Sequence, residues 1–589
     1  MRYRFAFLAL ATALLASCAT PPAPAPAPVT LRLIAFNDYH GNLEAAPGLT
    51  LPWPDPSVQP TKAVRLNAGG AAYLAGTVAA LRAGAAHSLV ISSGDMIGAT
   101  PLVSALFRHE STIDIANRIG VDLAIPGNHE FDAGREELLR VLAGGCLENK
   151  PDALYISCPL GTHPGARFPL MAANVVDAQG KTLFVPSVVR EVGGVKVGFI
   201  GAVTKITPSI VVPSGVAGLR FTDEATAINA EAARLQAQGV QALVAVIHEG
   251  GETGTPGQPL EWNDAACPNP RGAIFDIARR LAPSIDVIFS AHTHQGYRCI
   301  VDGRPILQAT ALGRGVSVAD LVLDPRTGDV DRARSTQRNL PVFNDKSDAR
   351  LREAIIAAEP EPYAQALREV RPVAAVAERV AAYAAAAAPR AQRPVGRIAG
   401  HFDRQSSTDT SAGRLIADAQ WRATQAAERG GAQFALMNPG GVRTDLRCPG
   451  QPPCTITYGE AFTMQPFGNS LVVMTLSGAE LKQLLEDQQP ARRSTPQFLT
   501  PSASLSYRWV ASAAPGQRVR DLQVNGQPVN PAADYRFTVN SFMADGGDGF
   551  KGLQAGRQRL GGELDIDALV AYLASGPAPD PVARIRLEP

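Results

Sequence analysis

The stretch IPGNHEFDAG, residues 125–134, directly follows the largely apolar residues VDLA. A short apolar run of this kind is typical of a buried strand. Just after it come an amide (Asn128), an imidazole (His129) and two acids (Glu130 and Asp132). In α/β proteins, ligands bind beyond the carboxyl ends of the strands, so these groups indicate a site at the edge of a sheet.

Four other apolar runs end in the same kind of residue. LRLIAF is followed by NDYHGN, SLVISS by GD, ALVAVI by HE, and DVIFSA by HTH. The side chains concerned are Asp38, His40, Asp95, His248, His292 and His294. Because strand ends of this kind meet in one crevice, we expect these residues to converge with Asn128 and His129.

The residue types favour a metal centre. Five of the nine histidines lie at these strand ends, which is improbable for ordinary surface or core histidines. Mixed carboxylate and imidazole ligands suit Zn, Mn, Fe or Ni rather than Mg or Ca alone. We predict two divalent ions with Asp95 as the bridge between them. The other predicted ligands are Asp38, His40 and His294 for one ion, and Asn128, His248 and His292 for the other.

Such a pair of ions suits chemistry at phosphorus. Two ions about 3.5–4 Å apart lower the pKa of a bound water and clamp an in-line displacement. His129 is adjacent to the predicted ligand Asn128, so it faces the same crevice without being a ligand. Asp132 is three residues further on and can fix the tautomer of His129. We predict that His129 and Asp132 handle transition-state charge and the proton of the leaving group.

Length and composition predict more than one folded domain. A chain of 589 residues exceeds one ordinary core, and its hydrophobic fraction of 46% with 19% charged residues is that of a globular protein. A net charge of +1 gives no broad attraction to nucleic acid, so no polymer of this kind is expected as a partner. Strand-like and helical runs alternate over residues 30–345, which predicts a layered α/β domain. Residues 346–394 are predicted to be a helical linker, or else part of a flanking domain, and residues 395–589 a second, α+β domain.

The first residues predict export. Residues 1–18 have a positive start, an apolar stretch and the sequence LASC, which resembles a bacterial lipobox with Cys18 as the lipidated residue. The alternative is a non-lipidated signal with an incidental cysteine. The apolar run is shorter than the ~20 residues of a membrane-spanning helix. Residues 19–29 are a proline-alanine tether that would hold a domain away from a membrane. Ala19 permits sorting to the outer membrane, so we expect a periplasm-facing or surface lipoprotein.

The remaining cysteines predict disulfides. Six are left after Cys18, and an even number in an exported protein is typical of disulfide bonding. Neighbours in sequence suggest the pairs Cys146–Cys158, Cys267–Cys299 and Cys448–Cys454, although other connectivities are equally compatible with the sequence alone. None of the six stands in a CxxC motif, so a zinc–thiolate site is not indicated.

The motifs NDYHGN, GD, GNHEFD, H and AHTH resemble those of the calcineurin-like metallophosphoesterases. Together with the second domain, GNHEFDAG resembles the 5'-nucleotidase family, which also holds bacterial UDP-sugar hydrolases and 2',3'-cyclic-nucleotide phosphodiesterases. The resemblance covers nearly the whole mature chain. It implies an N-terminal metallophosphoesterase domain with β-sheets packed between helices, a helical linker that acts as a hinge, and a C-terminal substrate-binding domain.

The resemblance also implies a nucleotide pocket in the second domain. It is carried by NPGGVR (438–443), QPFGN (465–469) and NSFMADGGDGF (540–550). Phe467 and Phe542 would sandwich the base, whereas spacing alone would make them ordinary core aromatics. The remaining implied contacts are Asn438 and Arg443 to sugar and phosphate, Asp548 to the ribose, and Arg404 to phosphate. Pro439 and Arg414 depart from the family pattern, which leaves the preferred base and phosphate chain open.

The sequence therefore predicts a monomeric, membrane-tethered phosphohydrolase that removes phosphate from nucleoside 5'-monophosphates. Related activities stay open: UDP-sugar hydrolysis, cyclic-nucleotide phosphodiester or nucleotide pyrophosphate cleavage, and thiosulfate-ester hydrolysis. The phenylalanine pair favours a substrate that contains a base. The alternative of another class is a non-catalytic lipoprotein that binds metal or nucleotide.

Overall fold

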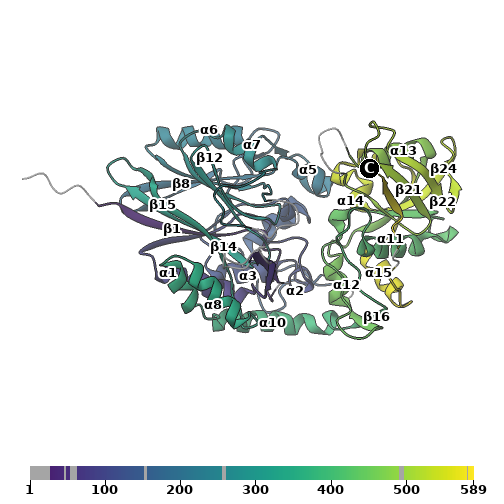
Figure 1. Cartoon of the computed structure of the whole chain (residues 1–589), viewed down its shortest axis with the longest axis horizontal. Coiled ribbons are helices and arrows are strands. Elements are labelled where there is room, and N and C mark those ends of the chain that lie inside the picture. The colour runs from purple at the N-terminus through teal and green to yellow at the C-terminus, as the bar shows by residue number, and fades with distance from the viewer. Residues whose placement is uncertain are drawn as a thin grey trace, which may run out of the picture.

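The computed structural model describes residues 27–45, 48–52, 63–150, 155–254, 261–489, 496–579 and 582–588. The predicted signal peptide, Cys18 and most of the predicted tether lie outside these residues. Among the residues described, no helix combines the length and apolarity needed to cross a membrane. Figure 1 shows a larger N-terminal body and a smaller C-terminal body, with helix α10 running from one to the other.

Two β-sheets face each other in the first body, and helices cover their outer faces. The first sheet is β15 (Asp329–Pro341), β14 (Gly315–Asp324), β1 (Val29–Phe36), β4 (His87–Ser92) and β5 (Leu123–Ala124). The second is β12 (Gly296–Val301), β13 (Arg304–Ala309), β11 (Ile285–Ser290), β10 (Ala242–His248), β8 (Val195–Val203) and β7 (Ser187–Val192). Helices α1 (Ala71–Ala83) and α3 (Glu110–Ile119) lie on one side, and α6 (Glu224–Ala237) and α7 (Ala273–Arg280) on the other (Figure 1). The predicted layering is confirmed.

The direction of the central strands explains why the predicted ligand residues lie close together. β1, β4 and β5 run parallel in one sheet, and β8, β10 and β11 run parallel in the other. Every residue of β10 is buried, because a strand in the middle of two packed layers is covered on both faces. Leu33 of the first sheet and Val244 and Phe289 of the second belong to the shared core between the sheets. The carboxyl ends of these strands therefore open at one edge of the sandwich.

The segment predicted to be a linker forms three helices. They are α8 (Ala349–Ala358), α9 (Tyr363–Glu369) and α10 (Ala374–Ala391). α9 and α10 pack against α1, and Leu367 and Val376 share one core cluster with Leu74 of α1. Arg379 of α10 donates to Asp114 of α3 at 2.6 Å. These contacts favour the alternative that the segment packs as part of the first body, although α10 also reaches the second body at α12.

The second body has the predicted α+β character. Its larger sheet is β20 (Thr500–Pro501), β17 (Phe434–Met437), β24 (Asp534–Asn540), β19 (Ser470–Ser477) and β25 (Arg557–Leu564). A smaller sheet has β23 (Gln527–Pro528), β22 (Val519–Val524), β21 (Leu505–Val510) and β26 (Ile585–Glu588), and β16 (Pro394–Ile398) pairs with β18 (Cys454–Thr457). The main helices are α11 (Ser411–Thr424), α12 (Tyr458–Met464), α13 (Gly478–Glu486) and α15 (Asp565–Leu573). Capping boxes at Thr457 with Glu460 and at Ser477 with Glu480 begin α12 and α13.

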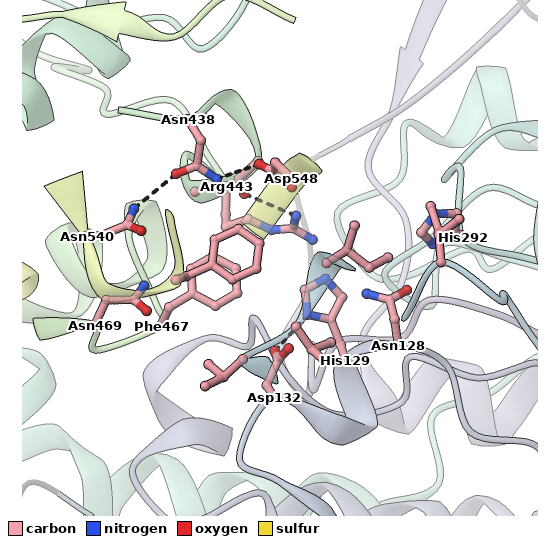
Figure 2. A pocket seen from close by; sticks show the side chains of 17 residues that line it. Asn128, His129, Asp132, His292, Asn438, Arg443, Phe467, Asn469, Asn540 and Asp548 are labelled. Atoms are coloured by element: carbon pink, nitrogen blue, oxygen red, sulfur yellow. Dashed lines mark hydrogen bonds and ion pairs between the residues drawn. The ribbon is translucent and has the colours of Figure 1, made fainter. Parts of the chain in front are cut away.

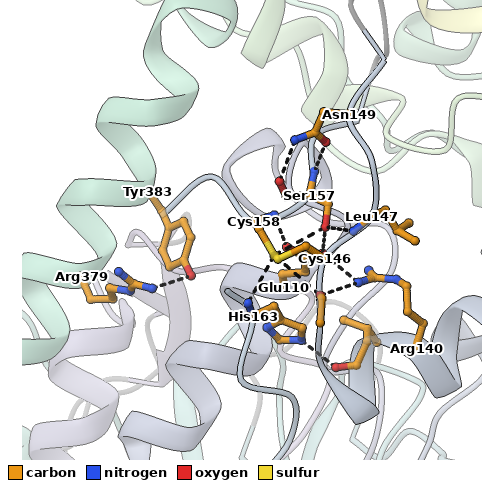
Figure 3. Close-up of a disulfide and its surroundings, with 12 residues drawn as sticks. Glu110, Arg140, Cys146, Leu147, Asn149, Ser157, Cys158, His163, Arg379 and Tyr383 are labelled. Atoms are coloured by element: carbon orange, nitrogen blue, oxygen red, sulfur yellow. Dashed lines mark hydrogen bonds and ion pairs between the residues drawn. A yellow bond between two sulfur atoms is a disulfide. The ribbon is translucent and has the colours of Figure 1, made fainter. Parts of the chain in front are cut away.

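All three predicted disulfides are present: Cys146–Cys158, Cys267–Cys299 and Cys448–Cys454. The first lies beside the buried carboxylate of Glu110 (Figure 3). Glu110 accepts from the backbone N–H of Cys158 and the hydroxyl of Ser157, both at 2.6 Å, and from Arg140 at 2.8 Å. The buried carboxylate of Glu110 thus fixes the loop that contains Ser157 and Cys158 by hydrogen bonds.

Candidate metal centre and adjoining cavity

The edge of the sandwich brings six of the predicted ligands into two groups. Asp38, His40 and His294 form one, and Asp95, His248 and His292 form the other, with the ligand atoms of each group within 4.8 Å of one another. Each group draws residues from both sheets, because β1 and β4 belong to one sheet and β10 and β11 to the other. This grouping is the one that the sequence predicts.

Asp95 lies between the two groups. Its Oδ2 atom is 3.1 Å from Nε2 of His248 and 3.7 Å from Nε2 of His40. Its Oδ1 atom accepts from the backbone N–H of His129 at 2.9 Å. One carboxylate oxygen therefore faces a histidine of each group, as the predicted bridging role requires.

The protonation pattern of the histidines fits metal binding. Nδ1 of His40 bonds to the carbonyl of Gly98 at 2.8 Å, and Nδ1 of His248 to that of Ser93 at 2.9 Å. A carbonyl only accepts, so both rings carry a proton on Nδ1 and turn Nε2 toward the other candidate ligands, with Nε2 of His40 3.1 Å from Nε2 of His294. Nε2 of His248 and Oδ1 of Asn128 are buried without a hydrogen-bond partner. A cation would satisfy both atoms, so the residues present fit a metal centre.

The backbone of the ligands is strained. Asp38, His40, Asp95, His292 and His294 all have φ between 45° and 73°. Residues other than glycine rarely adopt this left-handed conformation, and each such residue costs of the order of 1–3 kcal/mol. Strain of this kind persists where the surroundings impose it, and it concentrates at functional sites.

Glu130 holds the ligand loops and was not assigned a role from sequence. One of its oxygens accepts from the N–H groups of Asp95 at 2.9 Å and Gly127 at 2.6 Å. The other accepts from Met96 at 2.8 Å and Ile97 at 3.4 Å. The carboxylate therefore ties the loop of Asp95 to the loop that carries Asn128.

We expect Glu130→Gln to weaken metal binding about 10- to 100-fold, the usual cost of losing an outer partner of the ligands. Each oxygen of Glu130 faces N–H donors, so the amide group of glutamine must oppose one of them. The measurement is a calorimetric titration with Mn²⁺ or Zn²⁺, together with thermal unfolding. Glu110→Gln is the control, because Glu110 is equally buried and also accepts from backbone, but lies at the disulfide loop. Equal loss of metal affinity in both variants would show that Glu130 acts only through general stability.

His129 and Asp132 form the predicted pair. Nδ1 of His129 lies 2.7 Å from Oδ2 of Asp132, which leaves Nε2 free. Burial lowers the pKa of His129, but the charges of Asp132 and Asp95 outweigh it, so the pKa is raised overall. Figure 2 shows the His129 ring between Asp132 and the residues of the second body. The pair is arranged to hold a proton at the edge of the metal centre.

A cavity of about 300 Å³ joins this pair to the second body. Its lining includes Asn128, His129, Asp132 and His292 from the first body, and Asn438, Arg443, Phe467, Phe542 and Asp548 from the second (Figure 2). The ring of His129 stacks on that of Phe467 with centroids 5.9 Å apart, and the guanidinium of Arg443 lies 5.8 Å from the same ring. Burial lowers the pKa of Arg443 overall, although the charges of Asp95, Asp132 and Asp38 act in the opposite direction.

The predicted sugar contacts are linked to one another. Nδ2 of Asn438 donates to Oδ2 of Asp548 at 2.7 Å, and Oδ1 of Asn438 accepts from Asn540 at 3.0 Å. Asn540 and Asn469 also line the cavity; both stand in the quoted motifs but were not predicted. Arg404 is placed differently from the other predicted residues: it donates to the carbonyl of Arg443 at 2.6 Å and is not part of the cavity lining.

The comparisons with known proteins agree with this geometry. The family model described as "5'-nucleotidase, C-terminal domain" matches residues 394–555. The probable 5'-nucleotidase of Treponema pallidum is 27% identical, over 92% of this chain and 91% of its own length. Residues 394–555 thus belong to the family of 5'-nucleotidase C-terminal domains, and nearly the whole chain is similar to a 5'-nucleotidase.

A solved structure and a longer relative are also similar to this chain. A 5'-nucleotidase precursor from Thermus thermophilus superimposes with a TM-score of 0.71, at 24% identity, covering 95% of this chain and 100% of that one. Endonuclease YhcR of Bacillus subtilis is 32% identical over 93% of this chain, which spans 40% of the length of that relative. The two-body fold is thus that of a solved 5'-nucleotidase.

Proposed function

We propose that the chain releases phosphate from nucleoside 5'-monophosphates with the help of two divalent metal ions. The observation that carries this proposal is the single cavity that connects the metal centre to Phe467 and Phe542. When bound, the two ions would lower the pKa of a water and neutralise charge at phosphorus. Asp38, His40 and His294 would hold one ion, Asn128, His248 and His292 the other, and Asp95 both.

The chain's own residues account for the rest of the reaction. Arg443 offers a planar, permanently charged fork that matches phosphate oxygens. His129, oriented by Asp132, would hold or deliver a proton where the nucleoside oxygen leaves. Phe467 and Phe542 would stack on the base, and Asn438 with Asp548 would accept and donate hydrogen bonds at the ribose.

Phosphate release tests the proposal directly. The panel is 5'-AMP, UDP-glucose, a 2',3'-cyclic nucleotide and ribose 5-phosphate, each with Mn²⁺ or Zn²⁺ and with a chelator control. A phosphatase is added where the first product is still esterified. Fast, chelator-sensitive release from 5'-AMP over ribose 5-phosphate is expected. Equal rates on all four would contradict the nucleotide part of the proposal, and preference for UDP-glucose or the cyclic nucleotide would replace it with that activity.

Phe542→Ala should lower kcat/KM for 5'-AMP roughly 5- to 150-fold, because stacking on a base contributes about 1–3 kcal/mol. Phe542 is the better probe of the pair, since the ring of Phe467 also stacks on His129. The rate on ribose 5-phosphate, which has no base, serves as the internal control and should stay within about twofold. A variant that loses both activities equally would argue for a structural role of the ring.

We also propose that the chain is an exported lipoprotein with a lipid on Cys18, as residues 1–18 indicate. Cys18→Ser should move the protein from the membrane fraction to the soluble fraction of its cells. Lipid labelling of the natural chain and its loss in the variant provide the measurement. A protein that stays soluble with Cys18 intact would favour the non-lipidated signal.

A further inference from the structure

An apolar segment of the first body covers one side of the cavity. It comprises residues 206–212 (ITPSIVV), is called the strap below, and follows β8. Ile206, Ile210, Val211 and Val212 all line the cavity that Phe467 and Phe542 line from the second body. None of these aliphatic residues belongs to the metal centre or to the family motifs quoted above.

The residues on either side of the strap contact segments that carry site residues. Just before it, the N–H of Thr204 donates to the carbonyl of His248 at 3.0 Å, and its hydroxyl donates to Glu249 at 2.7 Å. Just after it, Gly215 packs so closely on Gly134 that a Cβ added to Gly134 would come within 3.2 Å of the Cα of Gly215. The strap therefore spans from the ligand His248 to the loop that carries His129 and Asp132.

The strap meets the second body across the cavity. Its helix α5 (Thr207–Ile210) contacts the short helix η5 (Gly547–Gly549), which contains Asp548. Figure 1 shows α5 on the side of the first body that faces the second. Ile206 is 46% exposed, a large fraction for an isoleucine at a cavity wall, while Val211 is only 1% exposed. An aliphatic surface is thus anchored beside the cavity and left open toward it.

We propose that the strap is a specificity-determining wall, which contacts the nucleoside of the substrate and selects esters with a planar, largely apolar group. The inference rests on the proposed function and assigns to it residues of the first body. A base between Phe467 and Phe542 would gain apolar contact with Ile206 and Ile210 on a further side. A sugar in that place would leave hydroxyl groups against aliphatic carbon without hydrogen bonds, which is unfavourable.

The test replaces Ile206 by asparagine, which is polar and neutral, in the full chain. We expect kcat/KM for 5'-AMP to fall at least about tenfold, mainly through KM, as changes in an apolar substrate pocket typically do. The rate on ribose 5-phosphate should stay within about twofold of the natural chain. Adenosine, measured as a competitive inhibitor, should bind more weakly to Ile206→Asn by a similar factor. The conservative variant Ile206→Val should keep most of the activity of the natural chain on 5'-AMP.

Ile300→Asn is the matched control, because Ile300 is 43% exposed on β12 and does not line the cavity. It should behave as the natural chain on both substrates. Unchanged activity of Ile206→Asn on 5'-AMP, or an equal loss on both substrates, would overturn the proposal. A natural chain that does not prefer 5'-AMP over ribose 5-phosphate would instead refute the proposed function, and the strap proposal with it.

Discussion

Replacing Asp95 by asparagine should reduce phosphate release from 5'-AMP at least about a thousandfold. The Oδ2 atom of Asp95 faces His248 at 3.1 Å and His40 at 3.7 Å, one histidine from each ligand group. An amide in its place presents either a neutral oxygen or an NH₂ group to two cations. The ions contribute several kcal/mol of charge stabilisation in the transition state, and each 1.36 kcal/mol corresponds to a tenfold change in rate.

Metal content separates this effect from general damage. Elemental analysis after dialysis should find two ions per natural chain and fewer than two in Asp95→Asn. Asp114→Asn is the control, since Asp114 is also a buried aspartate but pairs with Arg379 and Arg118, away from the ligands. The control should keep both ions even where its stability falls. Two tightly held ions in Asp95→Asn would remove Asp95 from the bridging position.

The convergence of the candidate metal ligands could be predicted because it depends on a simple property of the fold. Parallel strands end at one edge, so Asp38, Asp95 and His248, far apart in sequence, had to converge once the strands were recognised. The His129–Asp132 pair could be predicted for a local reason, because the two residues lie three positions apart in one turn of the chain. The disulfides likewise join cysteines that are neighbours in sequence.

Other parts of the site have no comparable pattern in the sequence. The role of Glu130 depends on N–H groups of residues 95–97, which only the folded loops bring near it. The residues of the strap that line the cavity are isoleucine and valine, which are typical of any core, so residue type does not distinguish a cavity wall from a packed interior. The phosphate contact of Arg404 is implied by the resemblance alone, whereas its hydrogen bond to the carbonyl of Arg443 is a tertiary contact that sequence spacing does not encode.

Replacing His129 by alanine should lower kcat for 5'-AMP by about 10²- to 10⁴-fold while both metal ions stay bound. This range is the usual contribution of a general acid or base. His129 contacts Asp95 through its backbone N–H, not its ring, so removing the ring leaves that contact to the predicted bridge intact. Asp132→Asn should have a smaller effect in the same direction, because it removes the partner that orients Nδ1 and leaves the ring in place.

The variant also separates an enzyme from a binding protein. Steady-state rates and metal content are measured on the same preparations, with His87→Ala as the control, because His87 is an exposed histidine at the start of β4. In a protein that only binds metal or nucleotide, His129→Ala would change the slow background release very little. If the variant instead lost its ions, His129 would be a ligand and the proton-handling role would have to pass to another group. Loss of turnover with two ions retained is the expected outcome, since His129 belongs to neither candidate ligand group and lines the cavity.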